Sequence, residues 1–203
     1  MSSLKMHIAI SKKVKEELKY SDLFIVGSIL PDIIKLILKE RTSSHFEINE
    51  TIDLDKYLLT QDNLKNELVL GYYAHLIEDK IWFESYVNKK YTKLKNFSHN
   101  NLYKDYAFID NLMYKKLDID TQSITKILLE NIDKIDLKSI NLMNCINDNL
   151  INNENVKEKI KEVWKDYEYE NKNYFYTIED AEKYYDLASK KVKECMETIG
   201  WFT

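Results

Sequence analysis

Apolar and polar residues follow one another along most of this chain with the spacing of amphipathic helices. Apolar positions recur at intervals of three and four residues, in segments rich in Lys, Glu, Leu and Ile. The pattern predicts a helix that opens at Pro31 and runs through IIKLILKE, together with helices over residues 3–19, 21–29, 53–60, 62–91, 101–117, 121–134, 138–151, 154–170 and 177–198. The segment TSSHFEINETIDLD and residues 96–101 are predicted as loops.

Two helix starts carry recognisable signals. Proline suits the first turn of a helix, where its missing N–H has no helical partner, so Pro31 places Asp32 at a helix start. The run Thr177-Ile178-Glu179-Asp180 fits a capping box.

Composition favours the same fold class. One proline and three glycines leave too little turn chemistry for a sandwich or barrel of many short strands. The apolar fraction of 44% and the charged fraction of 32% are ordinary for a soluble globular protein. At 203 residues one domain is the default, so we expect a single all-α domain over residues 1–203.

Charge and cysteine usage exclude several functions. The net charge is −4 and Arg41 is the only arginine, so nucleic-acid binding is not expected beyond a nucleic acid as substrate. Cys145 and Cys195 lack metal-site spacing and indicate buried thiols in a reducing compartment. The N-terminal apolar run lacks the features of a signal peptide, and LFIVGSILPDIIKLIL is too interrupted to span a membrane. We therefore expect a cytoplasmic protein without a transmembrane segment.

The stretch GYYAHLIEDKIWF, residues 71–83, holds the strongest chemical signal. His75 and Asp79 are four residues apart, so their side chains leave the same face of a helix and can bind one metal ion or bridge two. Gly71 precedes them by one turn and leaves room for another backbone or for an ion. A glycine within a helix costs about 0.5–1 kcal/mol relative to alanine, which indicates a steric demand. The alternative is a hydrogen-bonded pair in the core.

Further imidazole and carboxylate groups precede this stretch. His7 lies on the first predicted helix, Asp32 follows Pro31, and His45 lies in TSSHFE. Imidazole with carboxylate, and no cysteine, is the ligand set of a hydrolytic zinc site. Each residue also has a plainer interpretation: Asp32 as a helix cap, His45 as an exposed loop residue, and His7 on a solvated helix face.

The order of these elements resembles a known family. The chain resembles the zinc-dependent phospholipase C family, which is related to the S1/P1-type nucleases. The resemblance lies in the order of His7, GSILPD ending at Asp32, Ser44-His45-Phe46 and Gly71-x3-His75-x3-Asp79. The resemblance covers about residues 5 to 105. It implies an all-helical bundle with one to three zinc ions, a metal-site half over residues 1–105 and a helical half over residues 106–203.

The resemblance also implies roles for individual residues. Asp32, His45, His75 and Asp79 would hold one zinc ion, and Asp79 would bridge to a second ion shared with His7. Asp32 and Asp79 are accordingly the expected catalytic carboxylates. A water activated by metal would attack the phosphate ester, as in a two-metal in-line displacement.

The sequence departs from the family at several positions. The N-terminal Trp ligand of secreted members is missing, and His7 is the first available ligand. Where members have a further His after His-x3-Asp, this chain has KIWFES, with Glu84 as a substitute. A third ion would use His99 with Asp105, whose spacing is not that of the family. The lipid-binding β-domain of some phospholipase toxins is also missing.

The expected function is a metal-dependent phosphoric-ester hydrolase of the phospholipase C type, acting on a phosphate ester such as a phospholipid headgroup. Three alternative functions stay open: a nuclease, a small-molecule phosphatase on the same scaffold, and a non-catalytic protein with a structural metal. HD phosphohydrolases are excluded because no His is followed by Asp. The aromatic residues of the C-terminal third, with Trp82, fit helix packing better than a lip around a substrate.

Overall fold

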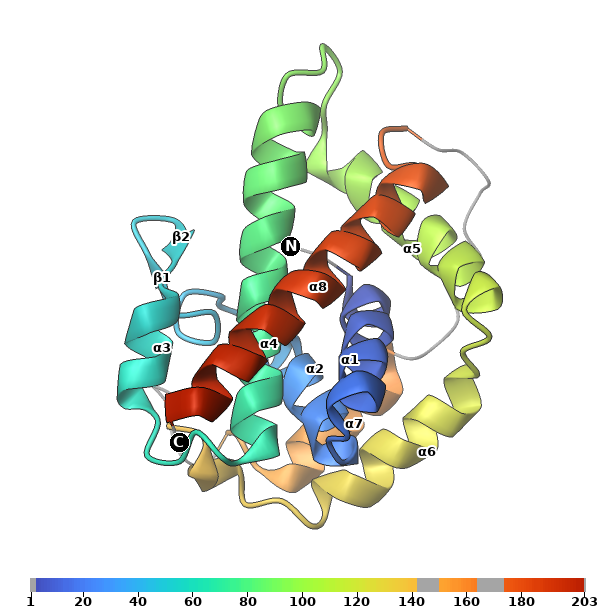
Figure 1. The fold of residues 1–203 in the computed structure, drawn as a ribbon. Coiled ribbons are helices and arrows are strands. Elements are labelled where there is room, and N and C mark those ends of the chain that lie inside the picture. Colours follow the sequence, from blue (N-terminus) through green and yellow to red (C-terminus); the bar gives the residue numbers. More distant parts are fainter. Residues whose placement is uncertain (1–2, 142–149, 164–173, 203) are drawn as a thin grey trace.

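The protein is all-α apart from one short hairpin in the computed structural model, which describes residues 3–141, 150–163 and 174–202 (Figure 1). Eight α-helices lie within these ranges: α1 Leu4–Leu18, α2 Asp22–Leu38, α3 Leu54–Thr60, α4 Glu67–Trp82, α5 His99–Lys116, α6 Thr121–Ile132, α7 Asn153–Val163 and α8 Ile178–Phe202. The remaining elements are the π-helix η1 Phe83–Tyr91, the 3-10 helix η2 Leu137–Ser139 and the antiparallel strands β1 Glu47–Ile48 and β2 Thr51–Ile52. The predicted all-α fold class is therefore confirmed.

Helices α2 and α4 form the centre of the molecule. They pack against each other more extensively than any other pair among the described elements. Helix α1 packs on α2, helix α8 crosses α1 and α4, and α6 and α7 pack against α2 on another side (Figure 1). Nearly every residue of α4 from Leu68 to Asp79 is buried, as expected for a helix surrounded by others.

Two glycines allow α2 and α4 to touch backbone to backbone. A methyl group on Gly71 would overlap the carbonyl oxygen of Phe24, and one on Gly27 would overlap that of Leu68 and lie 3.0 Å from the Cα atom of Gly71. The steric demand predicted at Gly71 is therefore the approach of another backbone. This contact sets how closely α2 and α4 approach each other.

The predicted helix break at Pro31 is wrong. Helix α2 runs without interruption from Asp22 to Leu38 with Pro31 inside it, so Asp32 lies in the middle of a helix. A proline within a helix costs about 3 kcal/mol, because its ring disturbs the carbonyl four residues earlier, here that of Gly27. Burial of the apolar residues on both sides of Pro31 outweighs this cost, because they pack on the same neighbours as one helix.

Other predicted boundaries shift. The loop after α2 contains the β1–β2 hairpin, and the long helix predicted over 62–91 is α4 continued by η1. Helix α5 begins at His99, within the loop predicted over 96–101. The predicted cap of α8 is present, because the amide of Asp180 donates to Oγ1 of Thr177 at 3.2 Å. Most of the helix predicted over 138–151 and the end of that over 154–170 lie outside the described residues.

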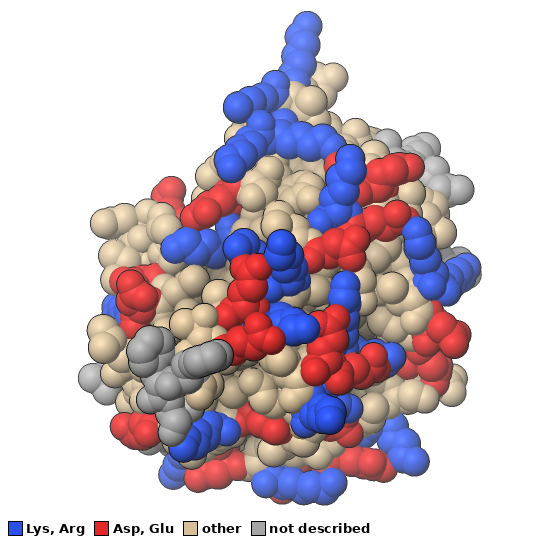
Figure 2. All heavy atoms as spheres, viewed as in Figure 1, with Lys and Arg blue, Asp and Glu red and all other residues tan. Residues whose placement is uncertain are grey.

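Basic residues gather at one end of the molecule. Figure 2 shows Lys side chains at the projecting end, where η1 and the turn after it lie in Figure 1. The sequence contains no acidic residue between Glu84 and Asp105, whereas Lys89, Lys90, Lys93 and Lys95 are all exposed. None of the described helices is both long enough and apolar enough to cross a bilayer.

Candidate metal centre

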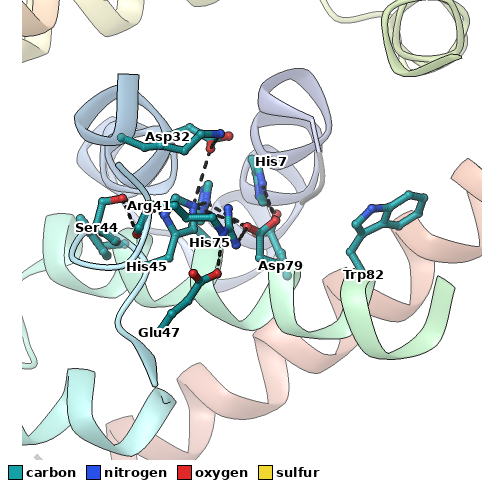
Figure 3. A network of polar contacts seen from close by, with 12 residues as sticks. His7, Asp32, Arg41, Ser44, His45, Glu47, His75, Asp79 and Trp82 are labelled. Carbon is teal, nitrogen blue, oxygen red and sulfur yellow. Dashed lines mark hydrogen bonds and ion pairs between the residues drawn. The ribbon is translucent and has the colours of Figure 1, made fainter. Parts of the chain in front are cut away.

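The five residues predicted as principal ligands lie together inside the bundle (Figure 3). His7 comes from α1, Asp32 from α2, His45 from the turn after α2, and His75 and Asp79 from one face of α4. The three histidines are fully buried, and Asp32 and Asp79 are nearly so. These residues form two overlapping groups that could hold metal ions, His7–His75–Asp79 and Asp32–His45–His75, with ligand atoms within 4.8 Å of one another.

Each histidine has its Nδ1 atom occupied by an oxygen outside these groups. His75 donates from Nδ1 to the carbonyl oxygen of Ser28 at 2.7 Å, and Nδ1 of His7 donates to Oε2 of Glu78 at 2.6 Å. Nδ1 of His45 lies 2.8 Å from the hydroxyl of Ser44. Metal-binding histidines are oriented in the same way, by a hydrogen bond from the ring nitrogen that does not bind the ion.

The tautomer of His45 follows from its neighbour. The Ser44 hydroxyl donates its proton to the carbonyl oxygen of Arg41 at 3.1 Å, so it accepts from Nδ1–H of His45. Tyr72 on α4 donates to the carbonyl oxygen of Ser44 and fixes the turn that presents His45. The Nε2 atom of His45 is therefore unprotonated and available as a ligand.

The Nε2 atoms of His45 and His75 face each other at 3.2 Å. Burial lowers the pKa of both rings; the charge of Arg41 lowers that of His45 further, and the charge of His7 lowers that of His75. Two neutral rings that both donate from Nδ1 present only lone pairs to each other. These two acceptors belong to a group of residues, Asp32, His45 and His75, that could hold a metal ion.

Asp79 joins the two groups. Its Oδ1 atom lies 3.3 Å from Nε2 of His7, while its Oδ2 atom lies 3.5 Å from Nε2 of His45 and 3.7 Å from Nε2 of His75. Burial alone would raise the pKa of Asp79, but the hydrogen bond from His7 and nearby positive charges, including Arg41, hold it well below its usual range. A charged carboxylate with one oxygen on each side has the arrangement of a bridging ligand.

Asp32 is the second carboxylate near Nε2 of His45, in addition to Asp79. Its Oδ1 atom is 3.6 Å from Nε2 of His45 and 3.4 Å from Nζ of Lys35. Burial would raise the pKa of Asp32, but the hydrogen-bonding contact with His45 and the proximity of His75 and Lys35 lower it. Asp32 therefore stays ionised beside His45, as a metal ligand must.

Glu78 is a buried acid that the sequence analysis missed. Burial raises its pKa to about 7, and the interaction with His7 opposes this rise. Burial would lower the pKa of His7, but Glu78 and Asp79 raise it to about 10. Glu78 lies on the part of α4 that faces His7 and accepts the hydrogen bond from its Nδ1 atom. In the sequence, only its position directly before Asp79 hints at this role.

The three weaker ligand predictions lie outside both groups. Glu84 and His99 line a cavity of about 220 Å³ beside the centre, together with Lys35, Arg41, Phe83, Leu102, Tyr103 and Tyr106. Asp105 is buried and accepts hydrogen bonds from the amides of Tyr174, Phe175 and Tyr176 at 2.6–2.9 Å. Its carboxylate fastens the segment that leads into α8.

The aromatic residues also have structural partners. Trp82 is buried, donates to the hydroxyl of Tyr106 at 2.7 Å, and packs against Tyr176 and Tyr184. In Figure 3 it points away from the histidines. Tyr167, Tyr169 and Cys145 lie outside the described residues, and Cys195 is a half-buried free thiol.

Comparisons with protein-family models, with curated proteins and with solved structures give no match to this chain.

Proposed function

We propose that the protein is a zinc-dependent hydrolase of phosphoric esters, of the phospholipase C type. The observation that carries the proposal is the facing pair of unprotonated Nε2 atoms of His45 and His75, flanked by carboxylate oxygens of Asp32 and Asp79. This ligand set, with nitrogen and oxygen and no thiolate, is that of hydrolytic zinc sites. The resemblance in the order of the ligands along the chain supports the same function.

The residues divide into two ligand sets. Asp32, His45, His75 and Oδ2 of Asp79 surround one position, and His7 with Oδ1 of Asp79 adjoins a second. Zinc bound there supplies a Lewis acid that polarises a phosphoryl oxygen and lowers the pKa of water. Asp79 couples the two positions, and Lys35, the partner of Asp32, lines the cavity wall.

The cavity beside the centre suits an anionic substrate. Its wall carries cationic or ionisable groups, which come from Lys35, Arg41, Lys80 and His99. It also carries carboxylates, which come from Glu47, Glu50 and Glu84. The basic end of η1 lies on the same helix as the cavity residues Phe83 and Val87. Clustered positive charge increases the rate at which anions reach a site, even on a protein of negative net charge.

A second candidate function is a structural metal site in a non-catalytic helical protein. The complete burial of His7, His45 and His75 favours it, because a structural site has a closed set of protein ligands. A zinc centre that hydrolyses no phosphate ester would fit this candidate alone.

Elemental analysis of protein purified without a metal-binding tag tests the proposal. We expect two zinc ions per chain in the wild type and, in His75→Ala, loss of the ion at the position that Asp32, His45 and His75 surround, because that position loses a nitrogen ligand. His99→Ala removes an exposed imidazole from the cavity wall and should keep the ions. Full metal retention in His75→Ala would contradict the proposal. A panel of phosphodiesters and phosphomonoesters then separates the phospholipase, nuclease and phosphatase activities.

A further inference from the structure

The guanidinium of Arg41 lies between the metal centre and the cavity. Its Nη2 atom donates to Oδ2 of Asp79 at 2.8 Å, and its Nε atom donates to Oε1 of Glu47. Arg41 also lines the cavity wall. The only arginine of the chain therefore contacts the proposed bridging carboxylate from the side on which a substrate would lie.

One side of this guanidinium is left without a partner. The Nη1 atom is buried and has no hydrogen-bond acceptor among the residues that the structure describes. A buried donor without an acceptor costs free energy, more so when it carries charge. Glu47 and Asp79 fix the plane of the group through Nε and Nη2, so Nη1 is held in position for an acceptor that the described protein does not provide.

The charges around Asp79 point to an anion as that acceptor. Oδ2 of Asp79 faces Nε2 of His45 and Nε2 of His75 as well as Nη2 of Arg41. A cation held by the histidines would therefore share this single oxygen with the guanidinium. Two positive centres on one carboxylate oxygen repel each other, and an anion that contacts both relieves the repulsion.

Arginine matches phosphate particularly well. Its planar fork presents two N–H groups in the geometry of two phosphate oxygens, and it stays charged at every physiological pH. A structural role alone, as a salt bridge to Glu47 and Asp79, would use Nε and Nη2 and would leave Nη1 unexplained.

We propose that Arg41 binds the phosphoryl group of the substrate, between the zinc ions and the cavity, and that this substrate is a small phosphate ester. The assignment rests on the proposed hydrolase function. The cavity of about 220 Å³ is smaller than the ~300–1,000 Å³ of common ligand pockets. It accommodates one phosphoryl group and a small substituent, for which Phe83, Leu102 and Tyr103 provide apolar contact.

Binding of inorganic phosphate to the zinc-loaded protein, measured by calorimetry, tests this assignment. Arg41→Gln should weaken phosphate binding about 10- to 100-fold, and Arg41→Lys, which keeps the charge without the fork, by a smaller factor. Lys39→Gln removes the same charge from an exposed residue two positions earlier and should change binding less than about twofold. Zinc content, measured in parallel, should stay at the wild-type value in all three variants.

Each other outcome has a separate meaning. Unchanged phosphate affinity in Arg41→Gln with zinc retained overturns the assignment, and so does loss of zinc in both Arg41 variants, because Arg41 would then only position Asp79. If Arg41→Gln does not fold, the Arg41→Lys variant decides: phosphate affinity equal to that of the wild type overturns the assignment. A wild type that takes up no zinc overturns the proposed function first, and the role of Arg41 with it.

Discussion

His75 on α4 donates its Nδ1 proton to the backbone of α2, at the carbonyl oxygen of Ser28 2.7 Å away. Ser28 directly follows Gly27, one of the two glycines through which these helices touch. The orientation of the central imidazole therefore depends on the distance between two backbones. A change in helix spacing is transmitted to the candidate metal centre without any change in its ligands.

Gly71→Ala should disrupt both the fold and the centre. The added methyl group would overlap the backbone of α2 at Phe24, so the helices must separate. We expect a loss of about 3 kcal/mol in the free energy of unfolding, together with weaker zinc binding. Gly200→Ala is the control, because a methyl group there meets nothing within 4 Å and should stabilise α8 by about 0.5–1 kcal/mol. Denaturant titration of both variants measures the difference, and equal stability would contradict the close contact.

Glu78→Gln should affect one zinc ion and spare the other. Glu78 orients only His7, whereas His45 and His75 are oriented by Ser44 and Ser28. A hydrogen-bond acceptor that orients a metal-binding histidine is worth about 10- to 100-fold in metal affinity. The ion beside His7 should therefore bind that much more weakly, while the ion beside His45 and His75 keeps its affinity. A competitive zinc titration resolves the two ions. Glu84→Gln, on the cavity wall, should leave both affinities unchanged, and a loss there would make Glu84 a ligand after all.

Asp110→Asn should stabilise the protein at neutral and higher pH. Burial raises the pKa of Asp110 from 3.8 to about 7, although Ser3, Lys5 and His7 act against this rise. The folded protein therefore keeps a proton that the unfolded chain releases, and stability is lost as the pH rises through this interval. At about pH 8 the variant should gain about 1–3 kcal/mol over the wild type, and the gain should vanish near pH 4. Asp62→Asn, an exposed site, should show neither effect in the same pH series of denaturant titrations.

Asp105→Ala should destabilise the fold and leave the zinc content intact. Both oxygens of Asp105 accept amide protons from the segment before α8. Loss of these hydrogen bonds should cost about 2–4 kcal/mol, since three amide donors, that of buried Tyr176 among them, lose their acceptor. Thermal unfolding and elemental analysis test the two halves of this prediction. Loss of zinc with wild-type stability would contradict this prediction and favour Asp105 as a metal ligand. Asp62→Ala, which removes an exposed carboxylate, is the control for both measurements.

Local periodicity predicted most helices, because the buried faces of α1, α5, α6 and α8 repeat with helical spacing. The break at Pro31 could not be predicted correctly from local signals, since the packing of α2 on α4 overrides them. The β1–β2 hairpin has no alternating apolar pattern, and its turn places Asn49 and Glu50 at positive φ values of 49° and 63° without a glycine. The continuity of α2 depends on contacts with a distant segment, whereas the hairpin depends on backbone conformations that its turn residues rarely adopt.

The candidate metal centre likewise combines local signals with contacts between distant segments. His75 and Asp79 share a helix face by spacing alone, whereas their proximity to His7, Asp32 and His45 depends on how α1, α2 and α4 pack. The resemblance suggested that these residues belong together. Arg41 and Glu78 gave no such signal, because a turn residue and a second acid beside Asp79 acquire their roles only from partners far away in the sequence.

The contact between Gly27 and Gly71 also has a consequence for how this protein can be traced through evolution. Surface residues can change freely, but a larger residue at either glycine would push the two backbones apart. A diverged relative that keeps the centre should therefore keep the paired spacing Gly-x4-Asp and Gly-x3-His-x3-Asp, even where the rest of its sequence has drifted beyond recognition.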